Sequence, residues 1–142
     1  MCLLKDKKVR NNHHKEDGLY VAYKIIRNDN VAPFQDSFKY SIGINIAEMS
    51  YLEEENSTFA FSGLHLFLSL KETKDFFHRS SSCFCLLDHL VFEYVKIIKV
   101  FYKPEDVLFY GHSIDAPWEA AKKNGRSVVV KSCLVKSLEP IV

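Results

Sequence analysis

The sequence predicts a single α+β domain with a mixed or largely antiparallel sheet and two or three short helices. Three observations predict it: segments rich in β-branched and aromatic residues recur along the chain, one of them runs into a helix-capping motif, and the helical segments are few and short. The chain has 142 residues, 47% of them hydrophobic and 26% charged, which suits one folded domain. We expect this domain to span residues 18–142, after a flexible polar arm at residues 1–17.

Two strands are expected near the start of the domain. Residues 19–27, Leu-Tyr-Val-Ala-Tyr-Lys-Ile-Ile-Arg, are mainly aromatic and β-branched and predict the first strand. Asn28-Asp29-Asn30 then predicts a turn. Residues 38–46 predict a second, shorter strand with Gly43 at a bulge.

A strand that leads directly into a helix is the most informative stretch of the chain. Residues 59–68 predict the strand, because bulky apolar residues dominate them. Ser69 and Glu72 form the capping pattern Ser-x-x-Glu, in which the side chains satisfy free amides of the first helical turn. We expect a helix from Ser69 to about Arg79.

The second half of the chain contains the strongest β signal. Residues 90–102 are largely apolar on both faces, as in a central strand that is covered on two sides. Extended structure is expected to resume at residues 107–110 after a break that contains Pro104. A short helix is expected over residues 116–123, and residues 126–138 predict a last long strand.

The net charge and the spacing of the cysteines exclude several classes of protein. The net charge of +1 argues against a domain whose whole surface is built for phosphate backbones. No apolar run reaches the roughly 18 residues of a membrane helix, and the N-terminus lacks a secretory apolar segment. The spacing of the four cysteines does not suggest a disulfide framework, so we expect a reducing cytosol and no membrane contact.

Four metal-ligand types lie close together in the middle of the chain, at His78, Cys83, Cys85 and His89. Zinc prefers four nitrogen or sulfur ligands. Cys-x-Cys is an uncommon chelate, however, and the apolar residues around it suit two buried thiols instead. The same residues allow a Cys–His nucleophile pair, but no residue in the pattern marks an oxyanion hole. We expect no metal and no cofactor.

Basic and aromatic residues alternate late in the expected central strand, at Tyr94, Lys96, Lys99, Tyr102 and Lys103. This chemistry is typical of surfaces that stack single-stranded nucleic acid. An ordinary strand with solvated lysines is the favoured interpretation, since Lys96 and Lys99 fall on opposite faces. Trp118, near His112, is either a binding hot spot or a core anchor.

The order of elements resembles the ADP-ribosyltransferase-type fold. Residues 22–27, Ala-Tyr-Lys-Ile-Ile-Arg, stand where that family has its first signature strand, and residues 63–69, Gly-Leu-His-Leu-Phe-Leu-Ser, stand for its second. The chain is also similar to small phage-encoded domains that share the Gly-Leu-His segment, a later Pro-x-Asp-Val as at residues 104–107, and a final basic-apolar strand as at residues 128–135.

The resemblance implies a ligand cleft, with NAD as the cofactor if the domain is an active transferase. The residues of that cleft would be Tyr23, Gly63, His65, Ser69 and Glu93. The catalytic triad is not matched, because Lys24 stands at the expected first-strand histidine and no Glu-x-Glu occurs on the last strands. The resemblance therefore implies the fold without the catalysis.

The leading expectation is a non-catalytic, phage-encoded interaction domain that binds and modulates or inhibits a host macromolecule, either a protein or a ribonucleoprotein. Its expected contact surface consists of Tyr102, Lys103, Tyr110 and Trp118, because aromatic side chains dominate interface hot spots. Two alternatives stay open: a small NAD-dependent ADP-ribosyltransferase-like enzyme and an RNA-binding domain. We expect a cytoplasmic location, which is the host cytosol if the protein is phage-encoded.

Overall fold

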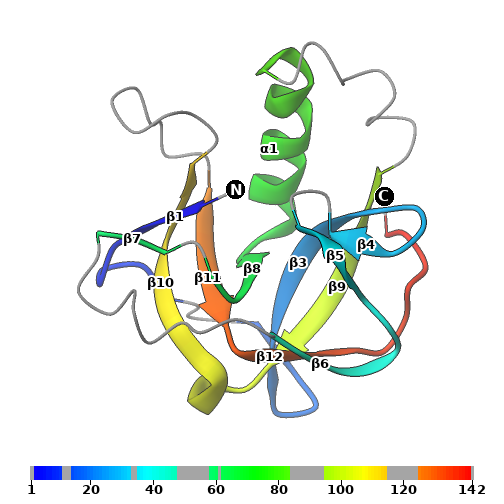
Figure 1. The fold of residues 1–142 in the computed structure, drawn as a ribbon. Helices are drawn as coiled ribbons and strands as arrows, with labels where there is room; N and C mark the ends of the chain where they lie inside the picture. Colours follow the sequence, from blue (N-terminus) through cyan, green and yellow to red (C-terminus); the bar gives the residue numbers. More distant parts are fainter. Residues whose placement is uncertain are drawn as a thin grey trace.

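A computed structural model describes residues 2–10, 14–32, 35–47, 58–60, 62–83, 95–114 and 125–141. These residues form mostly antiparallel strands, with one α-helix and one 3-10 turn among them (Figure 1). The expected α+β fold with two or three helices is therefore wrong, and the fold is largely β. The second expected helix, at residues 116–123, lies outside the described residues.

The described strands form a large sheet and a two-stranded one. The large sheet contains β1 (Cys2–Lys5), β2 (Lys15–Glu16), β3 (Leu19–Arg27), β6 (Gly43–Ile46), β7 (Phe59–Ala60), β8 (Leu64–Phe67), β9 (Val95–Tyr102), β10 (Val107–Ile114), β11 (Arg126–Val130) and β12 (Ser132–Val135). The small sheet pairs β4 (Val31–Ala32) with β5 (Gln35–Lys39). The strand order in the large sheet is β6-β12-β9-β3-β8-β11-β10-β1-β7, and β2 pairs with β3.

Pairing with distant segments explains why the fold contains more strands than expected. The segment expected as an arm includes β1, which lies between β10 and β7, and β2, which pairs with β3. Asp17 and Gly18 join β2 to β3 with φ angles of 53° and 79°, as a tight hairpin turn requires. Short polar strands such as β2 carry little β propensity of their own, so partner strands decide their conformation.

The large sheet curls back on itself. Lys131 alone separates β11 from β12, yet β11 pairs with β10 and β8 whereas β12 pairs with β9 and β6. The path β12-β9-β3-β8-β11 therefore returns to its start through this residue. The bend lies against a 3-10 turn (Pro104–Asp106) between β9 and β10, because the Lys131 amide donates to the Asp106 carbonyl at 2.9 Å.

The predicted strands correspond to the observed ones to different degrees. Residues 19–27 form β3 with the expected bounds. The expected strand at 126–138 bends at Lys131, and the expected strand at 38–46 divides into β5 and β6, which belong to different sheets. Gly63, with φ of 91°, lies between β7 and β8, where a single strand was expected.

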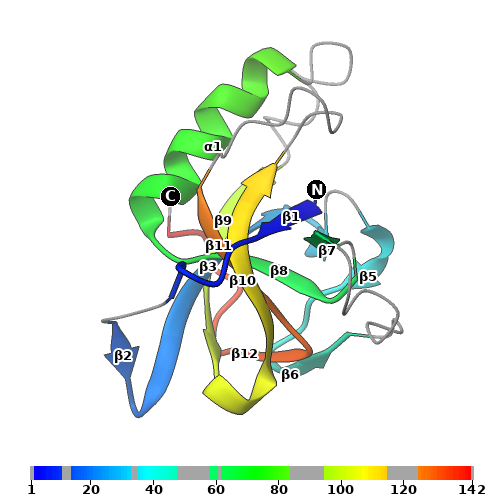
Figure 2. The same cartoon turned by 90° about the vertical axis from the view of Figure 1, so that its left-hand side faces the viewer.

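The helix α1 (Leu70–Cys83) begins where the capping motif predicts. The Glu72 amide donates to Ser69 Oγ at 3.1 Å, and Ser69 Oγ donates to Glu72 Oε2 at 2.7 Å. The Phe76 ring packs on the Phe67 ring of β8 with centroids 5.1 Å apart. Figure 2 shows α1 and the β2–β3 hairpin at opposite ends of the molecule.

The inner face of the curled sheet encloses the main core. Its buried apolar side chains include Ala22, Ile26, Leu64, Leu66, Ile98, Val100, Val128, Val130 and Val135. The outer face carries the alternate residues of the same strands. Part of that outer face, over β6, β12 and β9, forms an apolar groove.

Candidate functional site: an apolar groove beside an open sheet edge

Strand register aligns three large apolar side chains across the outer face. Leu134 is paired with Ile44 of β6 on one side and with Phe101 of β9 on the other. Directly opposed residues of an antiparallel sheet project to the same face. Cys133 and Val135 belong to the core cluster, so Leu134 between them projects outward. Solvent exposure falls along this row: the side chain of Ile44 is 70% exposed, whereas that of Phe101 is 4% exposed.

These side chains line an open groove of about 220 Å³. Its lining residues are Leu19, Ile44, Phe101, Tyr102, Lys103, Asp106, Ser132, Cys133 and Leu134. The polar end is held in place by Ser132, whose hydroxyl donates to Asp106 Oδ2 at 3.1 Å. The groove therefore combines an apolar centre with one charged end, an arrangement typical of small recognition sites.

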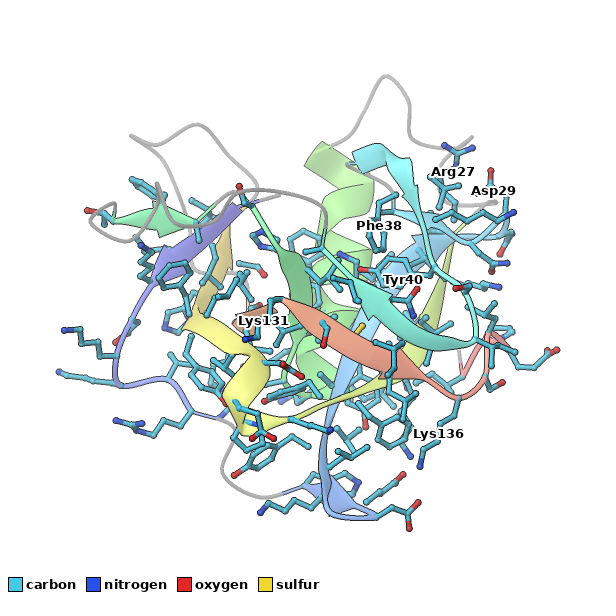
Figure 3. All side chains as sticks on the ribbon, turned by 60° about the horizontal axis from the view of Figure 1, so that its bottom comes forward. Arg27, Asp29, Phe38, Tyr40, Lys131 and Lys136 are labelled. Carbon is cyan, nitrogen blue, oxygen red and sulfur yellow. The ribbon has the colours of Figure 1, made fainter. Side chains whose placement is uncertain are left out.

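Lysines surround the apolar row. Lys136 Nζ lies 4.3 Å from the centre of the Phe101 ring, and Lys99 Nζ lies 5.8 Å from the same ring. Lys103 is exposed at the groove, and Lys131 and Lys136 lie at the two ends of β12 (Figure 3). Lys103 and Lys131 form no ion pair within the described ranges.

Two of the lysines bind carboxylates of the β2–β3 hairpin. Lys99 Nζ lies 2.5 Å from Glu16 Oε1, and Lys136 Nζ lies 2.9 Å from Asp17 Oδ2. A hydrogen bond from Lys99 lowers the pKa of Glu16, and one from Lys136 lowers the pKa of Asp17. These pairs hold the hairpin beside the groove.

A polar cluster lies beneath the groove, inside the core. Lys24 is 7% exposed, and its Nζ donates to the backbone oxygen of His65 at 2.9 Å. Burial lowers the pKa of Lys24 to about 8. Burial also raises the pKa of Tyr40, and it raises that of Cys133 to about 12. A thiol with this raised pKa stays protonated at neutral pH, which makes Cys133 a weak nucleophile.

The expected contact residues are distributed between core and surface. Tyr102 is 2% exposed and stacks on Tyr20 with ring centroids 5.5 Å apart. Its hydroxyl lies 3.3 Å from that of Tyr110, which is half-buried on β10. Lys103 is exposed at the groove, and Trp118 lies outside the described residues. Of this set, Lys103 is the residue whose exposed side chain borders the groove.

The residues of the implied transferase cleft lie along β8 and its neighbour β3. Tyr23 of β3 is paired with Phe67, two residues after His65, which is 4% exposed. Gly63 packs against β11, since a Cβ there would lie 3.3 Å from the Val130 carbonyl oxygen. Ser69 caps α1, as described above. None of these four residues lines the groove, and Glu93 lies outside the described part of the chain.

The expected zinc-ligand types and the aromatic-basic stretch are only partly described. His78 and Cys83 belong to α1, and Cys85, His89 and Tyr94 lie outside the described residues. Elsewhere in the described ranges, no group of three or more His, Cys, Asp or Glu residues is arranged to hold a metal ion. Lys96 donates to the Leu138 carbonyl at 2.8 Å, so its ammonium supports the C-terminal segment.

Sequence reasoning missed the exposed isoleucines next to the groove. Ile42, Ile44 and Ile46 are 67%, 70% and 65% exposed. Their signal is the alternation Ile-Asn-Ile over residues 44–46, which predicts that Ile44 and Ile46 share one face of β6, whereas Ile42 lies in the turn before the strand. Alternation alone places such a face against the core, whereas here the buried side chain is Asn45, 4% exposed.

No family model, curated protein or solved structure matches this chain. No helix in the part of the chain that the structure describes is long and apolar enough to cross a bilayer.

Proposed function

We propose that this protein is a non-catalytic interaction domain whose groove face binds a segment of another protein. The observation that carries the proposal is the continuous row Ile44–Leu134–Phe101, open to solvent at one end and bordered by lysines. Contiguous exposed apolar side chains with a polar rim are typical of protein interfaces. The proposed ligand is an apolar segment that carries carboxylates for Lys103 and Lys131.

The groove chemistry favours binding over catalysis. A catalytic thiol would need a lowered pKa, whereas that of Cys133 is raised to about 12. The carboxylate at the groove, Asp106, already accepts a hydrogen bond from Ser132. The resemblance to small phage-encoded domains makes a host protein our choice of partner.

The test compares matched variants in quantitative co-purification from a bacterial lysate. The groove variants are Lys103→Glu and Leu134→Thr, and the control is Lys39→Glu, an exposed lysine on β5. We expect a protein that co-purifies with the wild type and with the control to be lost by at least tenfold in both groove variants. Equal recovery with all four proteins would contradict the groove as the binding site.

The same preparations separate the two other classes of function. Binding through phosphates weakens steeply as salt rises, so loss of the bound material with salt and with nuclease would favour RNA. Transfer of label from labelled NAD to a lysate protein, abolished by His65→Ala, would reject the binding-only proposal in favour of the transferase.

A further inference from the structure

One edge of the large sheet is β6, whose outward backbone groups lie beside the groove. Within the described ranges β6 pairs with β12 alone. The Ala47 amide donates to the Lys131 carbonyl at 2.9 Å. Because hydrogen-bonded and non-bonded pairs alternate along an antiparallel ladder, the backbone groups of Asn45 face β12 and those of Ile44 and Ile46 face away from it. The edge therefore presents N–H and C=O groups at these two isoleucines.

The residues of this edge strand do not discourage pairing with another strand. Exposed edge strands are normally protected by lysine, proline or inward-pointing charge. Residues 43–46, Gly-Ile-Asn-Ile, contain neither a charged residue nor proline. The side chains of Ile44 and Ile46 are each about two-thirds exposed. An extended segment that lies along β6 would cover both of them.

The turn before β6 fixes where this edge begins. Asn45 Nδ2 donates to the Ser41 and Gly43 carbonyls at 2.9 and 3.2 Å, and its Oδ1 accepts from the Ser41 amide at 2.9 Å. Gly43, with φ of 109°, belongs to this turn. A pre-organised edge loses little conformational freedom when a strand binds it. The outward bonding positions of β6 are Ile44 and Ile46, so the strand that pairs with them is short.

Lysines determine the charge that complements this edge. Lys131 and Lys136 lie directly before and after β12, the strand next to β6 (Figure 3), and the exposed Lys103 lines the groove. A strand added to β6 would lie roughly 10 Å from β12, which is two strand spacings. The side chains of a lysine and a glutamate can span this gap together. Carboxylates at the ends of a bound segment therefore complement the edge.

We propose that the partner segment binds as a short antiparallel strand added to β6, with alternate apolar residues and a carboxylate at each end. This inference rests on the proposed function, because Ile44 belongs to both the edge and the groove. The apolar residues opposite Ile44 and Ile46 project onto the outer face. They extend the row Ile44–Leu134–Phe101 by one strand. Their N–H and C=O groups bond to those of the two isoleucines.

The composition of β6 favours a segment of another protein over a second copy of this chain. Residues 41–47 contain no charged residue, so β6 of a copy brings no carboxylate to Lys131 or Lys136. The turn at residues 41–43 also leaves few extended residues for two copies to align. The antiparallel direction agrees with the described pairs of the large sheet, and it is the more stable direction per residue.

Fluorescence anisotropy with a labelled peptide tests strand addition on the purified full chain. The probe is Glu-Ile-Thr-Val-Thr-Ile-Glu, and its charge-reversed control is Lys-Ile-Thr-Val-Thr-Ile-Lys. Ile46→Pro removes an outward amide, whereas Ile46→Thr keeps the amide and loses a similar apolar side chain. Ile46 does not line the groove. We expect Ile46→Pro to bind the probe about tenfold more weakly than Ile46→Thr, the effect of one lost hydrogen bond. The charge-reversed peptide should bind the wild type more weakly than the probe does.

Backbone methylation of the probe tests the register without changing the protein. In the antiparallel arrangement the amides of its isoleucine and valine residues face β6, and those of its threonines face away. An N-methyl group on the valine should therefore abolish binding, whereas one on a threonine should not. Circular dichroism verifies that Ile46→Pro and Ile46→Thr are folded. The methylated peptides decide the outcome if the proline variant does not fold.

The possible outcomes separate strand addition from the groove itself. Loss of binding in Leu134→Thr but not in Ile46→Pro would support the groove and overturn strand addition. A probe that fails to bind the wild type, or that loses binding through N-methylthreonine instead of N-methylvaline, would also overturn it. Loss in Ile46→Pro with full binding in Leu134→Thr and Lys103→Glu would support the edge and reject the groove. A wild-type dimer in sedimentation velocity that Ile46→Pro dissociates would assign the edge to a second copy instead.

Discussion

At the scale of single residues, Lys24 is the least expected feature of the core. It lies among apolar side chains and donates to one carbonyl, that of His65. Burial lowers its pKa from the usual 10.5 to about 8, so between these values the unfolded chain binds more protons than the folded one. The free energy of unfolding should therefore rise with pH in this window.

We expect Lys24→Met to remove this pH dependence. From pH 7 to pH 9, the free energy of unfolding of the wild type should rise by about 1 kcal/mol relative to that of the variant. Urea titrations at several pH values measure the difference, with Lys39→Met as an exposed control. The titrations stop at pH 9. Above this pH the raised pKa of Cys133 makes the free energy of unfolding fall as the pH rises, which opposes the effect of Lys24. Parallel curves for the wild type and Lys24→Met would contradict a buried ammonium.

At the scale of elements, Ser69 and Glu72 define the start of α1, and Glu72 also joins this helix to the sheet. Glu72 contacts the Ser69 cap and also accepts from Arg126 Nε at 3.0 Å, which ties the helix to β11. Burial raises the pKa of Glu72, but hydrogen bonds from Arg126 and Ser69 together outweigh it, and the pKa is lowered. The carboxylate therefore stabilises the fold at neutral pH and loses this contribution as the pH falls through its pKa.

Ser69→Ala should lower the free energy of unfolding by roughly 0.5–2 kcal/mol, because it removes the acceptor of the Glu72 amide. Lys71→Ala, at an exposed position of the same helix, should change it by no more than about 0.5 kcal/mol. Denaturant midpoints at equal m-value measure both. Equal midpoints for Ser69→Ala and Lys71→Ala would show that the cap contributes nothing.

At the scale of the whole molecule, the first residues of the chain complete the sheet. Leu3 is fully buried, in a cluster with Ala60 and Val129. Gly111 of β10 lies so close to β1 that a Cβ there would overlap the Leu4 carbonyl. The strands that position the groove are therefore tied to the N-terminus through β10 and β11.

We expect Leu3→Ala to lower the free energy of unfolding by about 2–5 kcal/mol, as for a buried leucine. Gly111→Ala should destabilise by about 1–3 kcal/mol, because the added methyl displaces β1. The control is Lys7→Ala, an exposed residue just after β1. If thermal melts of all three variants matched the wild type, residues 1–17 would act as the flexible arm that composition suggests.

The sequence by itself determined those parts of the structure that are stabilised by residues close together in the chain. The strand at residues 19–27 has the expected bounds, since its aromatic and β-branched residues favour extended structure by themselves. The helix begins beside Ser69, since its cap contacts a residue three positions away. Lys103, expected at a contact surface, is exposed at the groove.

Tertiary structure alone decided the largely β fold, the bend at Lys131 and the outward direction of Ile44 and Ile46. Each depends on pairing between segments far apart in the sequence, such as β12 with β6 and β1 with β10. The alternation at residues 44–46 puts Ile44 and Ile46 on one face and favours the core side for that face, whereas the pairing of β6 in the sheet turns it outward. The pairing of Leu134 with Ile44 directs the isoleucines outward, because it places Asn45 opposite Cys133 in the core.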